Sequence, residues 1–229
     1  MKRSSKNRLM PVHESLFTGE TLFDRIARAV CRAGVLPRKE LYEAWETARR
    51  VRRRFRGGRV VDMACGHGLL ALIMMILDRE SDQALAVDRR IPQSAGPLFE
   101  SLVQTWPFLD GRVTYLTGDL EEVVLEPGDM VVSAHACGSL TDLILNRATS
   151  ARARVAVLPC CHDLKTCDEG NLSGWMAPDL AVDAVRALRL KSRGYGIHTA
   201  AIPGQITPKN RLLMGWPDPE PPDEPAGGK

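Results

Sequence analysis

The stretch from Arg59 to Ala71 reads Arg-Val-Val-Asp-Met-Ala-Cys-Gly-His-Gly-Leu-Leu-Ala, and it decides which fold we expect. Its first five residues form a short apolar run typical of a buried strand, and the residues from Leu69 onwards are typical of an apolar helix. Between them, Gly66 and Gly68 form a loop in which the backbone can approach a ligand closely, because glycine has no Cβ. A strand that turns through a glycine loop into a helix is typical of a nucleotide-binding α/β domain.

The chain beyond this stretch alternates between short apolar runs and helical segments. We expect further strands at residues 83–87, 113–116, 129–134 and 155–158. The helices between them are expected at residues 69–77, 95–105, 140–148 and 180–191. Two final strands, at residues 195–202 and 206–215, are separated by a short connector and should pair antiparallel. This layout resembles class I (Rossmann-like) methyltransferases: a mainly parallel seven-stranded sheet in an α/β fold, with a C-terminal antiparallel hairpin and here an N-terminal helical segment.

The segments that flank this domain differ from it in composition. Residues 13–56 are basic and predict two helices, the first over residues 20–34 and the second ending in an arginine cluster. Residues 57–216 form the expected methyltransferase domain. We expect a disordered basic terminus over residues 1–12 and a disordered Pro-rich tail over residues 217–229, because neither stretch can bury a core.

The composition predicts a cytoplasmic chain with reduced thiols. Its 229 residues include 6 cysteines at uneven spacing, and adjacent Cys160 and Cys161 cannot easily form two ordinary disulfides. No window approaches the roughly 18 apolar residues that span a bilayer, and no apolar signal core follows the basic start. We therefore expect no membrane partner, while the oligomeric state stays open.

The basic residues are concentrated in the first quarter of the chain. Residues 1–58 hold 15 Lys and Arg residues against 6 Asp and Glu residues. Within them Arg52, Arg53 and Arg54 belong to a run that could neutralise the phosphates of a nucleic acid. The alternative is a solvated helix end, where cations are favourable in any case. The run makes RNA the preferred substrate partner.

Carboxylates follow the first three expected strands. Asp62 stands at the entrance of the glycine loop, Asp88 follows Gly68 by 20 residues, and Asp119 follows the third strand. A carboxylate in the position of Asp88 can accept hydrogen bonds from two ribose hydroxyls. Glycines at such a turn can also serve tight packing alone, but the combination with acids at successive strand ends favours a nucleotide-like cofactor.

Two cofactors fit this loop. Residues 66–71 satisfy the dinucleotide fingerprint G-x-G-x-x-G/A. S-adenosylmethionine (SAM) is favoured because it has no pyrophosphate, so that Asp62 can face its cationic methionine end. Asp119 also lies where methyltransferases bind the adenine amine. The expected cofactor contacts are Asp62, Ala64, Cys65, Gly66, Gly68, Asp88, Arg89, Asp119, Leu120 and His135.

Histidines and cysteines follow the fourth and fifth strands. Residues 133–139 read Ser-Ala-His-Ala-Cys-Gly-Ser, and residues 158–163 read Leu-Pro-Cys-Cys-His-Asp. Ligands of α/β sheets bind beyond the carboxyl ends of the strands, so these side chains should converge where the reactive methyl group lies.

This chemistry has several interpretations. His135 or His162 could act as a general base, since imidazole titrates near neutral pH. Cys160, Cys161, His162 and Cys167 could bind zinc, but adjacent cysteines are awkward ligands for one tetrahedral ion, and we assign no metal. The thiols could instead only pack beneath the strand ends. A thiolate nucleophile of the kind used on cytosine is a minor alternative.

The motifs resemble a known family. Asp-x-x-Cys-Gly-x-Gly (62–68), His-Ala-Cys-Gly-x-x-Thr-Asp (135–142) and Pro-Cys-Cys-His (159–162) are similar to the catalytic domain of eukaryotic tRNA acceptor-stem 2′-O-methyltransferases and their relatives. Residues 206–211 are similar to the ending of bacterial members. The resemblance covers roughly residues 55–216.

The resemblance implies SAM binding and an acceptor pocket bordered by thiols and imidazoles. The residues it places at the border of that pocket are His135, Cys137, Cys160, Cys161 and His162. Of these, we take His135, His162, Cys160 and Cys161 as catalytic candidates, and we expect Cys137, Asp142 and Asp163 to bind the acceptor. The chain lacks the zinc-finger-like N-terminal modules of the eukaryotic tRNA enzymes, so their substrate does not carry over. The first glycine of the usual loop is Ala64 here, which should still permit binding.

We therefore predict a SAM-dependent methyltransferase with RNA (tRNA or rRNA) as its acceptor. A small-molecule or protein acceptor is the first alternative. Two further alternatives stay open. A NAD-dependent oxidoreductase would have the same first βα unit as a methyltransferase, and a non-catalytic RNA-binding scaffold would need only the basic surface. The acceptor atom and the modified position cannot be read from the residues.

Overall fold

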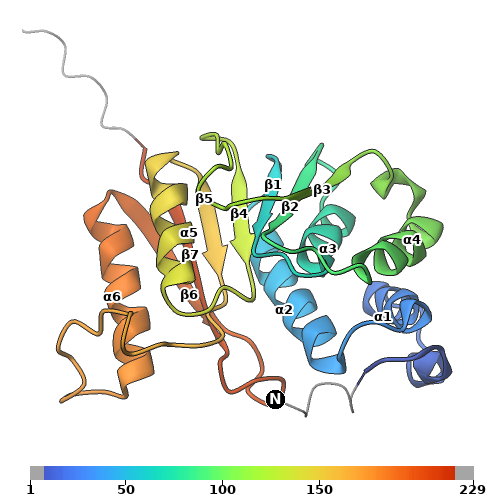
Figure 1. Ribbon diagram of the computed structural model, residues 1–229, viewed down its shortest axis with the longest axis horizontal. Helices are drawn as coiled ribbons and strands as arrows, with labels where there is room; N and C mark the ends of the chain where they lie inside the picture. The colour runs from blue at the N-terminus through green and yellow to red at the C-terminus, as the bar shows by residue number, and fades with distance from the viewer. Residues whose placement is uncertain (1–7, 220–229) are drawn as a thin grey trace, which may run out of the picture.

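The computed structural model describes residues 8–219, and its centre is a seven-stranded sheet in the order β3-β2-β1-β4-β5-β7-β6 (Figure 1). The strands are β1 (Val60–Met63), β2 (Ala84–Asp88), β3 (Val113–Thr117), β4 (Met130–Ser133), β5 (Arg154–Val157), β6 (Tyr195–Ala201) and β7 (Arg211–Pro217). Strands β1 to β5 pair parallel, whereas β7 is antiparallel to both β5 and β6. The expected parallel sheet with a terminal hairpin is confirmed.

Helices cover both faces of the sheet. One face carries α1 (Leu22–Ala33), α2 (Arg38–Arg54), α3 (Leu69–Leu77) and α4 (Ala95–Thr105), and the other carries α5 (Ser139–Ser150) and α6 (Pro178–Ser192) (Figure 1). Short 3₁₀ helices span Pro11–Leu16 and Pro107–Leu109. Along β1, Val60 joins the core of the first face and Val61 joins the core of the second, as the alternation of strand side chains requires. No helix within residues 8–219 is long and apolar enough to cross a membrane.

The two N-terminal helices lie where the sequence predicts them. Thr21 caps α1 by accepting a hydrogen bond from the backbone N–H of Asp24 at 3.2 Å, and Gly34 ends the helix in a left-handed conformation with φ +67°. Helix α2 starts directly after Pro37. Both helices share one hydrophobic core with the sheet, so residues 13–56 are part of the same packed unit as the predicted methyltransferase domain.

Two expectations about irregular segments need correction. Residues 8–12 are ordered: Leu9 is buried, and its N–H donates to the carbonyl oxygen of Leu36 at 2.9 Å. Near the other end, the N–H of Asp218 donates to the carbonyl oxygen of Gly194 at 2.8 Å. The rest of the two segments expected to be disordered, residues 1–7 and 220–229, lies outside the described residues.

The last strand starts later than predicted. Residues 206–210 belong to a turn and not to β7, because the N–H of Ile206 donates to the carbonyl oxygen of Pro203 at 3.0 Å. The side-chain amide of Asn210 also donates to the carbonyl oxygen of Ile202, at 2.8 Å. These bonds close a connector between β6 and β7 that lies beside the start of α2, where it lines a cavity.

Candidate active site

A cavity of about 370 Å³ opens at the carboxyl ends of the central strands. Its walls include Asp62 near the end of β1, Asp88 at the end of β2 and His135 after β4. The strand order reverses between β1 and β4, and α/β sheets bind ligands at such a reversal. The volume falls in the range of about 300–1,000 Å³ that is usual for small-molecule and cofactor sites.

The glycine loop leaves this cavity open. Gly66 has φ +54°, and a Cβ built on it would meet no atom of the described chain within 4 Å. Gly68 has φ +74° for a different reason, since a Cβ there would lie 2.6 Å from the hydroxyl oxygen of Tyr115. Gly66 therefore keeps space for a ligand, and Gly68 keeps the loop packed against β3. Ala64 takes up the left-handed conformation too, with φ +59°, so the departure from glycine at this position keeps the backbone course of the loop.

Asp88 holds the loop and faces the cavity. Its Oδ2 accepts a hydrogen bond from the N–H of Gly66 at 2.9 Å, and its Oδ1 accepts one from the N–H of Arg90 at 3.1 Å. A carboxylate has about four acceptor positions, so two remain for a ligand. Asp88 thus borders the cavity with acceptor positions to spare, and ribose binding by Asp88 stays a prediction.

Asp62 is a buried acid on the cavity wall. Its side chain is 1% exposed, and its Oδ2 accepts a hydrogen bond from the N–H of Ala71 at 3.1 Å, which ties β1 to the first turn of α3. Burial raises the pKa of Asp62 to about 7, and the charge of Asp88 adds to the shift. Among the described residues, no basic side chain forms an ion pair with Asp62. A cationic ligand group in the cavity would supply the missing charge.

This raised pKa gives a testable pH dependence. Folded Asp62 keeps its proton up to about pH 7, whereas an unfolded Asp loses it near pH 4, so its contribution to stability falls as the pH rises through this window. We expect the wild type to lose about 2–3 kcal/mol of unfolding free energy between pH 5 and pH 8 relative to Asp62→Asn. Urea unfolding of both proteins at the two pH values measures the difference. Parallel pH profiles would contradict the assignment.

Asp119 lies outside the cavity wall. It forms an ion pair with Arg89 at 3.1 Å. The hydrogen bond from the N–H of Glu121 lowers the pKa of Asp119, and Arg89 lowers it by a smaller amount. Arg89 is exposed, and Leu120 is buried in the core on the other face of the sheet. The structure therefore groups Asp62, Ala64, Cys65, Gly66, Asp88 and His135 around one cavity, and it leaves Arg89, Asp119 and Leu120 at its margin. Adenine binding by Asp119 stays a prediction.

The two candidate bases have different surroundings. His135 borders the cavity, where desolvation lowers its pKa and the nearby carboxylate of Glu40 opposes that shift. Its imidazole is therefore neutral at physiological pH and able to accept a proton. His162 is turned away from the cavity: its side chain is 3% exposed, and its Nε2 is 2.7 Å from Oδ1 of Asp183. His135 is thus better placed than His162 to act as a base.

A buried ion network fixes the loops after β4 and β5. Arg186, 1% exposed, donates to Oδ2 of Asp142 at 2.8 Å and to the carbonyl oxygen of Gly138 at 2.9 Å, and its NH1 lies 3.4 Å from Oδ1 of Asp183. Because Asp142 serves this network and does not line the cavity, it is a positioning residue in the structure. Asp163 is exposed and accepts a hydrogen bond from the N–H of Lys165 at 3.1 Å, which closes a local turn. Acceptor contact by either acid stays a prediction.

Three of the predicted cysteines meet beside the cavity. The Sγ atoms of Cys137, Cys160 and Cys161 all lie within 4.8 Å of one another. Burial raises the pKa values of the Cys137 and Cys160 thiols, so that both are protonated at neutral pH. A nucleophilic cysteine requires the opposite shift, which argues against a thiolate nucleophile at these two positions.

The arginine run requires a correction. Arg52 is 2% exposed, and its guanidinium binds Oδ2 of Asp78 at 2.9 Å, Oγ of Ser81 at 2.7 Å and the carbonyl oxygen of Met74 at 3.2 Å. The expectation that Arg52 contacts the substrate is therefore wrong, because its charge is used inside the fold.

The neighbours of Arg52 are exposed but distant from the cavity. Arg54 lies over the ring of Trp216, 4.3 Å from its centroid, and Arg53 is exposed on the same end of α2. Glu40, at the other end of α2, lines the cavity. Thirteen residues at about 1.5 Å rise separate Glu40 from Arg53, or about 20 Å along the helix. The run is therefore at the opposite edge of the sheet from the site.

The start of α2 is the part of the site that the residue pattern did not reveal. Glu40 and Ala44, four residues apart on one face of α2, line the cavity together with Leu36, which precedes the helix. Burial raises the pKa of Glu40, and the charge of His135 opposes the increase. The available signal was the i, i+4 pair of Glu40 and Ala44 in the first turns of the helix that follows Pro37.

A second, larger cavity lies on the other side of the same helix turn. Its volume is about 740 Å³, and Arg8, His13, Arg38, Lys39 and Gln205 supply polar groups to its walls. Arg8 is held there by pairing with Pro37. Burial lowers the pKa of His67, which lines the first cavity, and the charge of Arg8 lowers it further. Arg8 is thus a cation at the boundary between the two cavities.

Comparisons with known proteins identify the class. A family model described as a methyltransferase domain matches residues 39–167, which is more than half of the chain. The chain therefore belongs to this methyltransferase-domain family. The fold and the family together indicate S-adenosylmethionine as the cofactor.

Solved structures share the fold at low sequence identity. The chain is similar to a putative rRNA-methylase from Clostridium thermocellum (TM-score 0.54, 12% identity, 77% of this chain and 96% of that chain). It is also similar to an O-methyltransferase family protein from Burkholderia thailandensis (TM-score 0.52, 16% identity, 91% and 64%). The SAM-dependent methyltransferase SibL gives a TM-score of 0.53 at 18% identity, with 94% and 67% covered. At these identities the likeness concerns the class I fold, which is confirmed.

Curated relatives are longer proteins. The chain is 26% identical over 106 residues to a Glutathione S-transferase C-terminal domain-containing protein of Xenopus laevis. The matched region is 46% of this chain and 15% of the relative. A homologue of Drosophila melanogaster is 23% identical over 209 residues, covering 69% of this chain and 33% of the relative. The chain thus spans a third or less of the length of these relatives. The resemblance to tRNA acceptor-stem enzymes stays a prediction.

Proposed function

We propose that the protein transfers a methyl group from SAM to RNA. The observation that carries the cofactor half of this proposal is the open space in front of Gly66, bordered by the carboxylates of Asp62 and Asp88. SAM, when bound, supplies an electrophilic methyl group to a nucleophilic atom of the acceptor. Asp62 fits a cationic group because it has no basic partner among the described residues and such a group would stabilise its ionised form, and Asp88 retains free acceptor positions for hydroxyls.

His135 is the residue that we propose as general base. It borders the cavity and is neutral at physiological pH, because desolvation lowers its pKa. Glu40 on α2 is the carboxylate that interacts with it, and a charge there stabilises the imidazolium that forms when His135 accepts a proton. In this role His135 removes the proton from the acceptor hydroxyl or amine, while the cavity walls align the reacting groups.

The second cavity supports an anionic acceptor. Arg38 is exposed and packs over the ring of Tyr42, 5.5 Å from its centroid, and Arg8 stands at the boundary with the first cavity. Cations of this kind bind the phosphates of RNA. We propose that RNA reaches the site across this cavity and not across the distant end of α2 that carries Arg53.

Cofactor titration and methyl transfer test the function together. Calorimetric titration should give saturable binding of SAM and of S-adenosylhomocysteine, with no comparable binding of NAD. Labelled SAM should then transfer its methyl group to an RNA fraction, and His135→Ala should abolish transfer while retaining SAM binding. Preference for NAD would overturn the assignment as a methyltransferase. Label in a protein or small-molecule fraction alone would overturn RNA as the acceptor.

Two arginines of the same helix separate the proposed RNA path from the arginine run. We expect Arg38→Gln to weaken RNA binding and to reduce the slope of log affinity against log salt by about 1, the effect of one lost phosphate contact. Arg53→Gln, equally exposed at the other end of α2, is the matched control and should change neither. Filter binding at several salt concentrations measures both slopes. An effect of Arg53→Gln alone would contradict the proposed path.

A further inference from the structure

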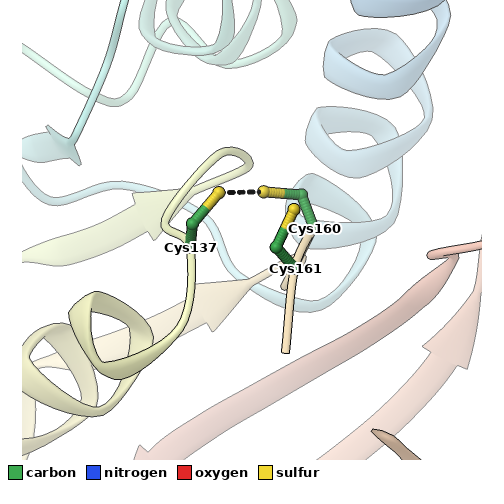
Figure 2. A group of neighbouring side chains, drawn as sticks. All are labelled: Cys137, Cys160 and Cys161. Atoms are coloured by element: carbon green, nitrogen blue, oxygen red, sulfur yellow. Dashed lines mark hydrogen bonds between the residues drawn. The ribbon is translucent and has the colours of Figure 1, made fainter. Parts of the chain in front are cut away.

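The thiols of Cys137, Cys160 and Cys161 form a cluster that the proposed methyl transfer does not use. Cys137 lies in the loop after β4, and Cys160 and Cys161 follow β5 (Figure 2). Figure 2 shows the three sulfur atoms gathered at one point between the two loops, with Sγ of Cys137 2.8 Å from Sγ of Cys160. Adjacent cysteines usually present their side chains in different directions, so the convergence of all three is a property of these loops.

We propose that these three cysteines bind one zinc ion and leave its fourth position to a solvent or exogenous ligand. This inference goes beyond the methyltransferase function and does not depend on it. The sequence pattern argued against zinc because Cys160 and Cys161 are adjacent, and it offered His162 and Cys167 as the other ligands. The structure replaces those partners with Cys137.

The distances suit a tetrahedral thiolate site. Zinc–sulfur bonds are about 2.3 Å long, which places two thiolates of a tetrahedral ion about 3.8 Å apart. The three Sγ atoms lie within 4.8 Å of one another, and the contact between Cys137 and Cys160, at 2.8 Å, has to widen by about 1 Å to reach this separation. Cys137 is exposed and its side chain is free to change χ1 by the small amount required.

The two loops are fixed relative to each other, as a metal site requires. The N–H of Gly138 donates to the carbonyl oxygen of Cys161 at 2.9 Å, which joins the loops directly beside the thiols. Arg186 holds the carbonyl oxygen of Gly138 at 2.9 Å, and Asp183 holds His162 at 2.7 Å. Each loop is therefore anchored to α6 one residue beyond a cysteine, and the ligands are preorganised.

A redox pair or simple thiol packing would leave part of this cluster unexplained. A redox pair needs two thiols, and it gives no reason for Cys161 to share the position of Cys137 and Cys160. Simple packing of thiols fits buried residues, but Cys137 and Cys161 are exposed. Zinc binding uses all three, and exposure provides the path by which the ion enters. Binding exchanges three S–H protons for one Zn²⁺, so affinity should rise with pH.

The described residues leave the fourth coordination position of the zinc ion open. Among the described residues, no His, Asp or Glu contributes a ligand atom to the cluster. Structural zinc sites are closed by four protein ligands, whereas sites that take an exogenous ligand keep one position free. The cluster is next to a residue of the first cavity, because the Cys137 thiol is 3.6 Å from the carbonyl oxygen of His135.

Metal titration of the full chain tests the site without any methyl-transfer assay. Protein purified under reducing conditions should contain about one zinc per chain. After removal of zinc with a chelator, added Co²⁺ should give sulfur-to-cobalt charge-transfer absorption and the visible bands of a tetrahedral ion, and Zn²⁺ should displace it. Cys137→Ser, Cys160→Ser and Cys161→Ser should each weaken zinc binding by more than the roughly 10–100-fold that loss of an outer-shell partner causes.

Cys167→Ser is the matched control. Cys167 lies in the same loop region but outside the cluster, next to Arg186 at 3.5 Å, so its variant should keep the cobalt spectrum of the wild type. Circular dichroism of each variant establishes that it is folded. The proposal is overturned by a folded protein without cobalt charge-transfer absorption, by unchanged affinity in Cys137→Ser, or by a Cys137–Cys160 disulfide with no metal in the purified protein. SAM binding is measured in a separate titration, so failure of the zinc proposal and failure of the proposed methyltransferase function can be distinguished.

Discussion

Asp88→Ala is expected to reduce SAM affinity by at least about 100-fold. The substitution removes the two acceptor positions that face the cavity, and hydrogen bonds to a charged group contribute about 1.5–3 kcal/mol each. It also removes the bond that holds the N–H of Gly66 at 2.9 Å, so the loop loses part of its preorganisation. Calorimetric titration with SAM measures the change, and wild-type affinity in a folded Asp88→Ala protein would exclude the cavity as the cofactor site.

Two matched variants show which part of Asp88 matters. Asp88→Asn keeps one acceptor oxygen and the side-chain shape, so its affinity should lie between those of the wild type and Asp88→Ala. Asp119→Ala removes a carboxylate from the end of the next strand that is exposed and paired with Arg89 outside the cavity wall. We expect less than a tenfold loss there. A larger loss would support binding of the adenine amine by Asp119.

The meeting of Asp62, Asp88 and His135 at one cavity could be predicted because it follows from chain order alone. Parallel strands bring their carboxyl ends to one edge, so Asp62, Asp88 and His135 had to meet if the strands were identified correctly. Gly66 in the loop after β1 marked where the backbone leaves space. These positions depend only on local pattern and one topological rule.

Contacts between segments that are distant in the chain could not be predicted in this way. Glu40 reaches the cavity because α2 packs beside α3, and nothing in the local sequence states which end of α2 faces the site. The contact of His162 with Asp183 could not be predicted for the same reason, because Asp183 lies on α6, 21 residues further on. The convergence of Cys137 with Cys160 depends on how two loops fold over adjacent strands, which spacing does not determine.

The arginine run shows how a pattern of charge can mislead about location. A run of cations looks uniform in sequence, but a helix distributes its residues around an axis, about 100° apart, so neighbours in the run face different environments. Arg52 faces α3 and is buried, whereas Arg53 faces solvent. The two residues therefore provide the sharpest comparison between a structural and a surface role.

Arg52→Met should lower the free energy of unfolding by about 3 kcal/mol. The substitution leaves Asp78, which is 3% exposed, without the guanidinium at 2.9 Å, and loss of one partner of a buried ion pair costs about 3–5 kcal/mol. Arg56, at 3.8 Å from Asp78, offsets part of that loss, which is why we expect the lower end. In a chain of this size the change corresponds to a melting temperature lower by about 6–12 °C.

Arg53→Met is the control for charge and for helix propensity, since it makes the same substitution one residue further along α2 at an exposed position. Its unfolding free energy should stay within about 0.5 kcal/mol of the wild type, as is usual for surface changes.

The double variant Arg52→Met/Asp78→Asn removes the carboxylate charge that Arg52→Met leaves unpaired. Its Asn still accepts the hydrogen bond from the N–H of Gly57. The double variant should therefore recover part of the stability lost in Arg52→Met. Equal destabilisation by Arg52→Met and Arg53→Met would contradict a stabilising role of the buried Arg52–Asp78 pair. The loss would then come from replacing arginine by methionine on this helix, whatever its position. A large effect confined to Arg52, with recovery in the double variant, would mean that the centre of the arginine run is part of the protein core and that only its exposed members are available to a nucleic acid.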